Sequence, residues 1–502
     1  MVSLRAMRDS WYRGCWLLVC WLLAGSLVSA AEYHYEFDAE AEAVYRDVMR
    51  LELDLAEAGI DRLRRTEPLN LVAEHLESYV DFFRLYLSGD EQLDARLQER
   101  FDRRIGRLEE GRTDSPWYNY ALAEAYLHRS LIDVRFERHL ASFRSLNRAN
   151  KYLRDNVDRF PDFLLTYKDL GLLHAAVGTI PPQYKWGVEL FSSLTGSIPQ
   201  GRKEMQRALG DTKSPFYTET GALYALMELY LADDAERALR TVRNLNLQPE
   251  RNKLHCFVLA TVIMRNDQNG EALRLLEAQP RAGSSAEFPY LDFMLGQAKL
   301  RNLNPQARIH YQSFLLRYPG RHFRQEAMQK IAWSYLLEGD TRAYHRAMAE
   351  IDGGSRAGGD ESAAREAAGG TVPHLGLLRA RLLFDGGYFE RARSELNAVD
   401  RADLSDDEQL ELLYRTGRVL DGLDDEAGAL SFYERTIARG RDNPAYYACN
   451  AALQAGLLEE ERERYAAARK YFNLCLEISP AEYRTGLHMM AKAGLDRIAA
   501  KS

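Results

Sequence analysis

Apolar residues recur at intervals of three and four along most of the chain, which is the spacing of one face of an α-helix. Over 43–65 the apolar positions are Val44, Val48, Leu51, Leu55 and Leu63. Similar patterns predict helices over 71–87 and 93–108, and a further helix that begins at Pro116, an early position that proline favours. Residues 31–116 are therefore expected to form an N-terminal helical region. No run alternates with the period of two expected of a strand, so the pattern predicts an all-α protein.

From residue 219 onward, small and bulky residues recur over a longer period. Each unit has a small residue near position 8, usually alanine near position 20 and a bulky residue near position 24, as in Gly456, Ala468 and Phe472. Small residues let two antiparallel helices approach closely, and large residues fill the space to the next pair. The units start at Glu219, Lys253, Phe288, Gln325, Pro373, Leu410 and Cys449, so their spacings are 34, 35, 37, 48, 37 and 39 residues.

These units resemble the tetratricopeptide-repeat (TPR) superfamily, whose helical hairpins repeat about every 34 residues. The resemblance covers 219–480 and, more loosely, 117–218. It implies a right-handed α-solenoid of TPR-like helical hairpins. We expect irregular TPR-like helices over 117–218, a first array over 219–351 and a C-terminal array over 373–502.

The 48-residue spacing has its cause in an insert over 352–372. This stretch contains three pairs of glycines with alanines between them, a composition typical of a flexible linker. We predict a flexible Gly-rich surface loop between the two arrays. A functional hinge or a recognition loop is the alternative.

Residues 178–199 interrupt another unit. Two similar turns, Gly-Thr-Ile-Pro and Gly-Ser-Ile-Pro, frame an amphipathic stretch whose apolar and aromatic residues include Ile180, Tyr184, Trp186 and Phe191. Three interpretations stay open: the stretch packs on the array, it contacts a partner protein, or it lies on a membrane surface. Some forty residues around it are also similar to the inclusion-body-clearance family of TPR proteins. We carry no function over from that similarity.

The first 30 residues have the pattern of a secretory signal peptide. Arg5, Arg8 and Arg13 precede an apolar run, and small residues lead up to Ala30. The apolar run is short for a membrane span, which needs about 20 residues. We predict cleavage after Ala30 and a periplasmic or secreted protein; retention of the segment as an anchor is the alternative.

Composition and charge exclude several classes of protein. Hydrophobic residues make up 46% and charged residues 28%, so the chain is not disordered throughout. A net charge of -8 argues against a nucleic-acid binder. Beyond the leader the cysteines are Cys256, Cys449 and Cys475, an odd number that argues against a disulfide framework. We expect buried thiols, and leave open whether Cys449 pairs with Cys475.

Motifs of catalysis and metal binding are missing from the sequence. It contains no His-x-x-x-His, no Cys-x-x-Cys, no phosphate-binding Gly-rich loop and no Gly-x-Ser-x-Gly. The abundant acidic pairs lie in helical patterns, where solvated faces are their usual place. The sequence therefore predicts no metal, no cofactor and no catalytic residue, and we do not expect an enzyme.

The remaining candidate is a binding surface. The TPR resemblance implies that the first helix of each unit lines a concave face through positions 2, 5, 9 and 12. Here these positions include Tyr230, Phe257, Thr261, His374, Arg381, Phe384, Tyr414 and Arg418. Aromatic and arginine side chains suit peptide capture. Trp333 also falls on this face, and we expect it to pack between helices.

We therefore predict a non-enzymatic scaffold of the cell envelope or periplasm that binds partner proteins or peptides, but not nucleic acid. One alternative is a membrane-surface adaptor that uses residues 178–199. The other is a glycan-binding or small-ligand-binding protein, or an enzyme, that uses the concave groove. The sequence predicts no oligomeric state.

Overall fold

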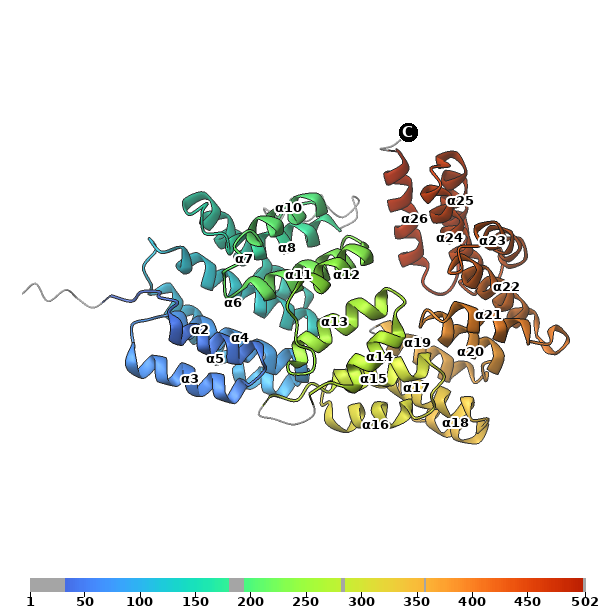
Figure 1. The fold of residues 1–502 in the computed structure, drawn as a ribbon, viewed down its shortest axis with the longest axis horizontal. Helices are drawn as coiled ribbons and strands as arrows, with labels where there is room; N and C mark the ends of the chain where they lie inside the picture. Colours follow the sequence, from blue (N-terminus) through green and yellow to red (C-terminus); the bar gives the residue numbers. More distant parts are fainter. Residues whose placement is uncertain (1–31, 180–193, 281–284, 356–357, 500–502) are drawn as a thin grey trace, which may run out of the picture.

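The computed structural model describes residues 32–179, 194–280, 285–355 and 358–499. These residues form α-helices and no β-strand, apart from an isolated bridge between His34 and Asn70. The prediction of an all-α solenoid is confirmed. Figure 1 shows the helices following one another in pairs from the blue N-terminal end to the red C-terminal end.

The N-terminal helices differ from the sequence pattern at one turn. The region contains α2 (Ala39–Met49), α3 (Leu53–Thr66), α4 (Val72–Ser88) and α5 (Glu91–Glu109). The apolar period over 43–65 predicts one helix, but the structure has two, because Leu51 takes a left-handed backbone conformation with φ of 59°. Leu51 is completely buried, so the apolar pattern runs on through a turn that the period does not reveal.

Two hairpins follow the N-terminal helices. They are formed by α6 (Pro116–Arg135) with α7 (His139–Arg159), and by α8 (Thr166–Gly178) with α10 (Ile198–Ala208). Helix α6 begins at Pro116, as predicted, with Ser115 accepting a hydrogen bond at its N-cap. In the second hairpin a Cβ on Gly201 would lie 2.2 Å from the carbonyl oxygen of Gly171. Only glycine permits this approach.

The predicted insert over 178–199 lies largely outside the described residues. Ile180, Tyr184, Trp186 and Phe191 all fall in the undescribed range 180–193. On either side of that range, Gly178 and Ile198 lie close together, because a Cβ on Gly178 would be 2.7 Å from the backbone nitrogen of Ile198.

The array from residue 217 to residue 348 consists of four hairpins. Their helices are α11 (Tyr217–Tyr230) with α12 (Ala235–Asn244), α13 (Lys253–Arg265) with α14 (Asn269–Glu277), α15 (Tyr290–Arg301) with α16 (Ala307–Arg317), and α17 (Arg324–Leu337) with α18 (Thr341–Met348).

The C-terminal array has three hairpins and a final helix. They are α20 (Leu375–Phe384) with α21 (Phe389–Asn397), α22 (Asp406–Asp421) with α23 (Glu426–Gly440), α24 (Tyr447–Glu461) with α25 (Tyr465–Glu477), and α26 (Arg484–Ala499); a 3-10 turn, η1 (Arg401–Asp403), precedes α22. A capping box between Ser405 and Glu408 starts α22. The first helix of each hairpin contacts the first helix of the next, so α11, α13, α15, α17, α20, α22 and α24 form one continuous layer.

The small and bulky positions of the repeat meet as the sequence predicts. A Cβ on Gly456 would lie 2.6 Å from the ring of Phe472, and one on Gly417 would lie 2.8 Å from the ring of Tyr433. Phe472 and Tyr433 are both completely buried. In these two hairpins, a glycine on the first helix thus accepts an aromatic ring from the second.

The range 352–372, where the glycines predict a flexible insert, contains helix α19 (Gly358–Gly369). Asp360 holds this helix in place by accepting hydrogen bonds from the backbone N–H groups of Phe323 and Glu326, at the start of α17. Ala363 is completely buried. The helix exists because α17 offers it partners far away in sequence, which glycine content alone does not indicate.

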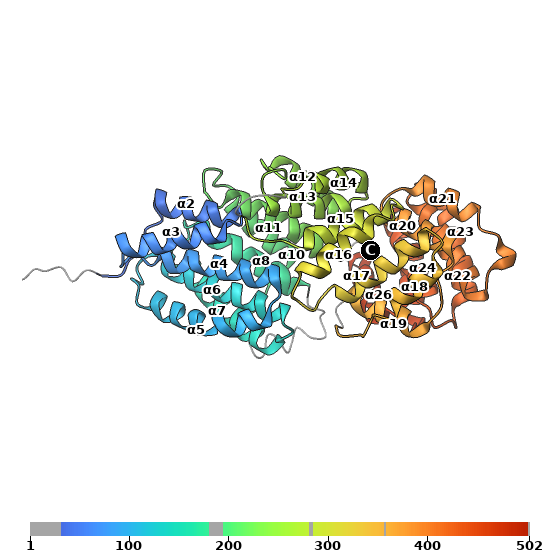
Figure 2. The ribbon, with the colours of Figure 1, turned by 90° about the horizontal axis from the view of Figure 1, so that it is seen from below.

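The N-terminal helices lie against the middle of the array. The side-chain amide of Asn252 donates to the carbonyl of Met49 at 2.9 Å, and the backbone N–H of Ala286 donates to the carbonyl of Leu51 at 2.6 Å. A ring nitrogen of His322 lies 2.8 Å from the carbonyl oxygen of Arg135. Figure 2 shows the blue and cyan helices of the N-terminal part beside the green and yellow helices of the array.

Candidate functional site

The predicted concave-face residues fall into two separate groups. Arg381 and Phe384 on α20 meet Arg418 on α22, whose guanidinium carbon lies 5.0 Å from the centre of the Phe384 ring. Tyr414, one turn before Arg418, is 4% exposed. His374 belongs to the same array but is the N-cap of α20, where its ring accepts from the backbone N–H of Leu377.

The other three predicted residues lie on α11 and α13. Tyr230 ends α11 and is 58% exposed, whereas Thr261 on α13 is buried. The Phe257 ring packs against Phe288 and Tyr290, with ring centres 5.4 and 6.2 Å away. These three residues do not join the arginine group.

The arginine group continues onto α17 and forms what we call the cationic face. It is defined by Lys330, Trp333, Arg381, Phe384, Arg415 and Arg418. These residues lie on α17, α20 and α22, three successive first helices that contact one another. Because these helices belong to one layer, Lys330 and Arg418 lie on the same face although they are nearly ninety residues apart in sequence.

The cations of this face lie against aromatic rings. The Lys330 Nζ atom is 3.6 Å from the centre of the Trp333 ring, and the Arg381 guanidinium carbon is 4.9 Å from it. Trp333 is only 2% exposed, so it packs between helices as expected. Such contacts stabilise a cation most when water is excluded from it.

Three of the four cations of the cationic face form no ion pair with a described residue. Arg415 forms an ion pair with Glu411. Within the described residues, no carboxylate lies within 4.0 Å of Lys330, Arg381 or Arg418. Burial lowers the pKa of Lys330 to about 8; the charge of Arg381 adds to this shift, whereas the nearby carboxylates, Glu326 first among them, oppose it. These three cations therefore lack a directly bound carboxylate among the described residues.

Tyrosines extend the cationic face toward the C-terminus. The Tyr414 ring packs against Tyr446 and Tyr447, with ring centres 5.7 and 5.2 Å away. Tyr446 in turn contacts Tyr483, just before α26. Their rings offer stacking area beside the arginines, a combination that is enriched at protein interfaces.

Sequence reasoning missed two cations of this face. Lys330 and Arg415 both lie five residues after the start of their units, Gln325 and Leu410. This is position 6, next to the position 5 that the TPR pattern uses. A comparison of position 6 between units would have indicated both residues.

A second cluster of charged residues is buried in the N-terminal half. The Lys168 Nζ atom on α8 lies 2.7 Å from Glu124 on α6, 2.9 Å from Glu219 on α11 and 3.6 Å from its neighbour Asp169. Tyr45 donates to Glu219 at 2.7 Å, and Tyr120 donates to Glu124 at 3.0 Å. Helices α2, α6, α8 and α11 thus converge on one ammonium group.

Burial and charge set the protonation of this cluster. Lys168 is fully buried, and so are nearly all the groups around it. Burial raises the pKa of Asp169 to about 8, against the pull of Lys168, whereas the Lys168 charge holds the pKa of Glu124 at about 2 despite burial. The raised pKa of Asp169 means that this carboxyl keeps its proton near neutral pH.

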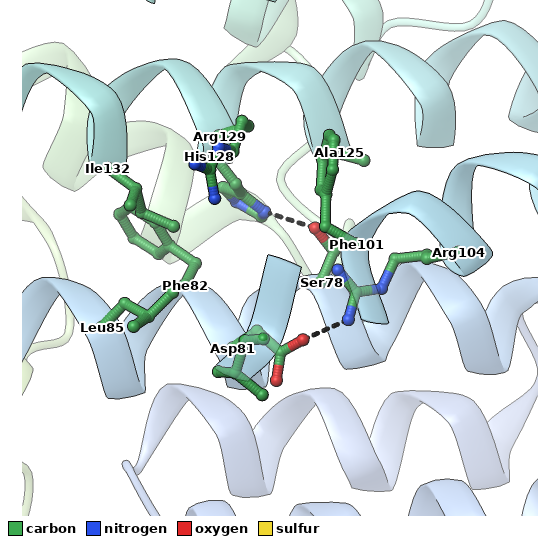
Figure 3. Close-up of a pocket in the computed structure, with 11 residues that line it drawn as sticks. Ser78, Asp81, Phe82, Leu85, Phe101, Arg104, Ala125, His128, Arg129 and Ile132 are labelled. Carbon is green, nitrogen blue, oxygen red and sulfur yellow. Dashed lines mark hydrogen bonds and ion pairs between the residues drawn. The ribbon is translucent and has the colours of Figure 1, made fainter. Parts of the chain in front are cut away.

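Two histidines border the cluster from α4 and α6. His75 lies 3.3 Å from Glu124, and His128 makes a 2.9 Å hydrogen bond with Ser78. Figure 3 shows His128, Ser78 and the ion pair between Arg104 and Asp81 around a cavity of about 20 Å³. That volume holds about one water molecule. This cavity borders His128 and is not lined by Lys168 or its carboxylates, which are themselves buried or nearly so among the helices.

The sequence does contain a signal for this buried cluster. His75 and Tyr79 are four residues apart, as are Tyr120, Glu124 and His128. This spacing places each set on one face of its helix. A polar stripe within an otherwise apolar helix indicates a buried network, but it does not show that Lys168 and Glu219 complete it.

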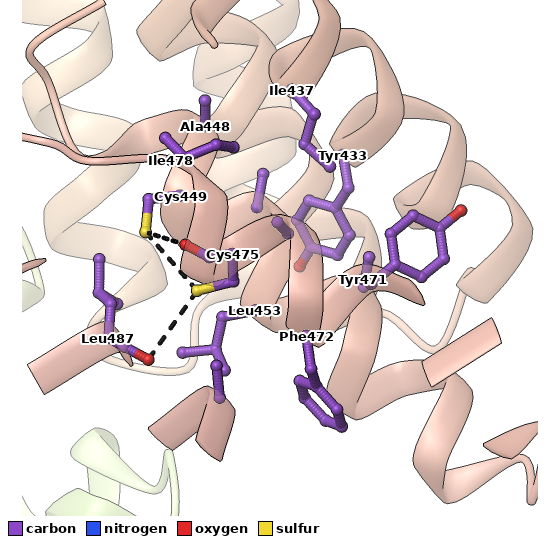
Figure 4. Packing of buried hydrophobic residues seen from close by; sticks show 14 of the residues in the cluster. Tyr433, Ile437, Ala448, Cys449, Leu453, Tyr471, Phe472, Cys475, Ile478 and Leu487 are labelled. Atoms are coloured by element: carbon purple, nitrogen blue, oxygen red, sulfur yellow. Dashed lines mark hydrogen bonds between the residues drawn. The ribbon is translucent and has the colours of Figure 1, made fainter. Parts of the chain in front are cut away.

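Two cysteines meet in the C-terminal core. Cys449 on α24 and Cys475 on α25 are free thiols with their sulfur atoms 3.6 Å apart, and both are completely buried. Figure 4 shows them among Leu453, Ile478 and Leu487. The hydrogen bond between the thiols lowers the pKa of Cys449 and raises that of Cys475.

Neither a metal cluster nor a membrane helix was found in the described ranges. No three or more His, Cys, Asp or Glu side chains there are grouped so as to hold a metal ion. None of the helices in those ranges combines the length and the apolar character needed to cross a bilayer.

Comparisons with known proteins give a match to solved structures alone. No protein-family model matches the chain, and no curated protein matches it. Among solved structures that do match is the TPR domain of P58(IPK), with 13% sequence identity and a TM-score of 0.21, covering 82% of this chain and 96% of that one. The helical hairpins and their small-to-large contacts, rather than this overlay, support a TPR-like repeat fold.

Proposed function

We propose that this chain is a non-enzymatic scaffold that binds acidic segments of partner proteins through the cationic face. The observation that carries the proposal is that three cations of that face, Lys330, Arg381 and Arg418, have no carboxylate of the described residues within 4.0 Å. A charge removed from water is costly unless it is paired. A partner carboxylate supplies the missing pair, and arginine can bind it through two parallel hydrogen bonds.

The aromatic residues of the face add affinity that charge alone does not supply. Phe384 and the tyrosines around Tyr414 offer apolar area beside the arginines. Aromatic and arginine residues are the commonest dominant contacts at protein interfaces. The expected partner segment therefore contains acidic residues together with apolar ones.

The cell envelope or periplasm is the proposed location, on the strength of the leader pattern in residues 1–30. N-terminal sequencing of protein isolated from the native cells tests this step. A mature chain that begins at Ala31 supports export, and a chain that retains residues 1–30 contradicts cleavage.

Charge reversal tests the binding face. The mature chain, residues 31–502, is used to capture proteins from its native envelope, beside an Arg381→Glu/Arg418→Glu variant. A matched control is Arg342→Glu/Arg346→Glu, because both of these arginines are exposed on α18, the second helix of its hairpin. The control changes the net charge equally but leaves the cationic face intact.

Partners that bind the mature chain and the control, but not the Arg381/Arg418 variant, support the proposal. Their release should rise steeply with salt, since exposed charge pairs are screened. Partners retained by all three proteins would contradict the proposal and favour residues 178–199 or the N-terminal region. Liposome sedimentation with a Trp186→Glu variant then tests the membrane alternative.

A further inference from the structure

Helix α19 lies beside the cationic face and joins two distant parts of the array. It packs against α17, and its residues Ser362 and Arg365 contact Tyr483 and Glu482 just before α26. Figure 1 shows α19 next to α17. A short helix thus bridges the last hairpin of the first array and the end of the C-terminal array.

One side chain of α19 is held by three donors. Glu366 accepts hydrogen bonds from the indole N–H of Trp333 at 2.8 Å, from the amide of Gln329 at 2.6 Å and from the hydroxyl of Tyr344 at 3.0 Å. Lys330 and Arg381 both pack against the ring of the same Trp333. The helices α17 and α18 therefore form a carboxylate-binding site that is continuous with the cationic face, and Glu366 occupies it.

The rest of α19 contributes little apolar contact. Its sequence is Gly-Gly-Asp-Glu-Ser-Ala-Ala-Arg-Glu-Ala-Ala-Gly, without any apolar side chain larger than alanine. Only Asp360 and Ala363 are buried. Glycines flank it on both sides, and Gly353, Gly358 and Gly370 have positive φ values. Polar contacts therefore hold α19 in place. Another helix with the same polar groups can make these contacts instead and displace α19.

We propose that α19 is an internal ligand of the cationic face, which an acidic helix of a partner protein displaces. This inference rests on the function proposed above and adds the form of the partner segment. Charge complementarity supports it, because α19 carries Asp360, Glu361 and Glu366 against a single arginine, Arg365. A partner helix places one carboxylate in the Glu366 site and directs others toward Arg381 and Arg418.

Displacement makes partner binding weaker in the intact chain than in a chain without α19. The apparent affinity is reduced by the fraction of molecules in which the site is open. If the site is open in about one molecule in ten or fewer, removal of α19 strengthens binding about tenfold or more.

The helix itself serves as the probe. A fluorescent synthetic peptide of residues 358–369 is titrated into the intact mature chain and into a variant in which 356–370 is replaced by a Gly/Ser linker of equal length. Fluorescence anisotropy reports binding. We expect saturable binding to the linker variant that is at least about tenfold tighter than binding to the intact chain.

Two altered peptides test the role of the carboxylate. Glu366→Ala removes the group that the three donors hold, and the matched control Glu361→Ala removes an exposed carboxylate bonded only to Arg365 within α19. The first peptide should bind at least about tenfold more weakly than the second, because it leaves buried donors unpaired. Equal binding by the two peptides, or none by the natural peptide, overturns the proposal.

Hydrogen exchange keeps the test valid if the linker variant fails to fold. In the full chain, Glu366→Ala should speed exchange of the 358–369 amides while α22 and α24 keep their protection, and Glu361→Ala should not. Unchanged exchange in the Glu366→Ala chain overturns the proposal. If the peptide fails to bind but charge reversal at Arg381 and Arg418 still removes envelope partners, α19 is structural and the proposed function stands.

Discussion

The two buried histidines beside Lys168 predict a specific loss of stability in acid. Burial lowers the pKa of His75 to about 4 and that of His128 to about 3. Both side chains have an ordinary pKa near 6.5 when the chain unfolds. Because the folded pKa of each base is depressed, the unfolded state binds more protons below pH 6.5, and stability is lost as the pH falls toward 4.

The magnitude follows from the proton balance. At pH 5.5, an unfolded histidine is about nine-tenths protonated while the buried one stays neutral, which costs the folded state about 1.4 kcal/mol. The two histidines together lower the free energy of unfolding by about 2–3 kcal/mol between pH 7.5 and pH 5.5. Asp169 acts in the opposite direction, because its raised pKa of about 8 favours the folded state as the pH falls.

A comparison of variants isolates the histidines from Asp169. Urea unfolding of the mature chain and of a His75→Phe/His128→Phe variant is followed by tryptophan fluorescence, to which Trp117 contributes; its ring centre is 5.5 Å from that of His75. The variant removes both titrations but keeps the aromatic contacts, so its overall stability serves only as a baseline.

The quantity measured is the free energy of unfolding of the mature chain minus that of the double variant, as a function of pH. This difference should fall by about 2–3 kcal/mol between pH 7.5 and pH 5.5, with each single variant showing about half of the change. Parallel pH profiles for the mature chain and the double variant would refute the assignment of neutral, buried histidines.

Three further predictions concern packing and charge. Lys168→Met should lower the free energy of unfolding by about 3–5 kcal/mol, because it leaves buried carboxylates without their counter-ion. Urea unfolding measures this change. A loss below about 1 kcal/mol would contradict the pairing of Lys168 with these carboxylates. Gly456→Ala should lower the melting temperature, because its Cβ would meet an aromatic ring at 2.6 Å, whereas Gly486→Ala, with nothing within 4 Å, should not. Diamide should oxidise Cys449 and Cys475 to a disulfide, because their sulfurs are 3.6 Å apart. Mass spectrometry would show the loss of two hydrogen atoms. If both thiols are instead found alkylated after unfolding, the core prevents the disulfide from closing.

The tertiary structure decided how the predicted binding residues are grouped. Arg381, Phe384, Tyr414 and Arg418 come together because α20 and α22 are neighbours in the layer of first helices. Tyr230 and Phe257 satisfy the same positional rule but lie on α11 and α13, away from the arginines. Position within a repeat indicates a face, whereas the path of the array decides which residues of that face meet.

The sequence alone determined the repeat itself. The spacing of Gly456 and Phe472 predicts their contact, because both residues belong to one hairpin and the approach of its two helices depends only on residues within it. The break at Leu51 is also local, but the apolar period runs through it and conceals the turn.

Contacts between distant segments required the folded chain. Lys168 is paired by carboxylates more than forty residues away on either side, and Glu366 is held by donors on two earlier helices. Neither arrangement leaves a period in the sequence, because each depends on how separate hairpins stack. Local packing rules therefore predict the solenoid from the sequence, while the charged sites that give it a function arise only where the stacked hairpins bring distant residues together.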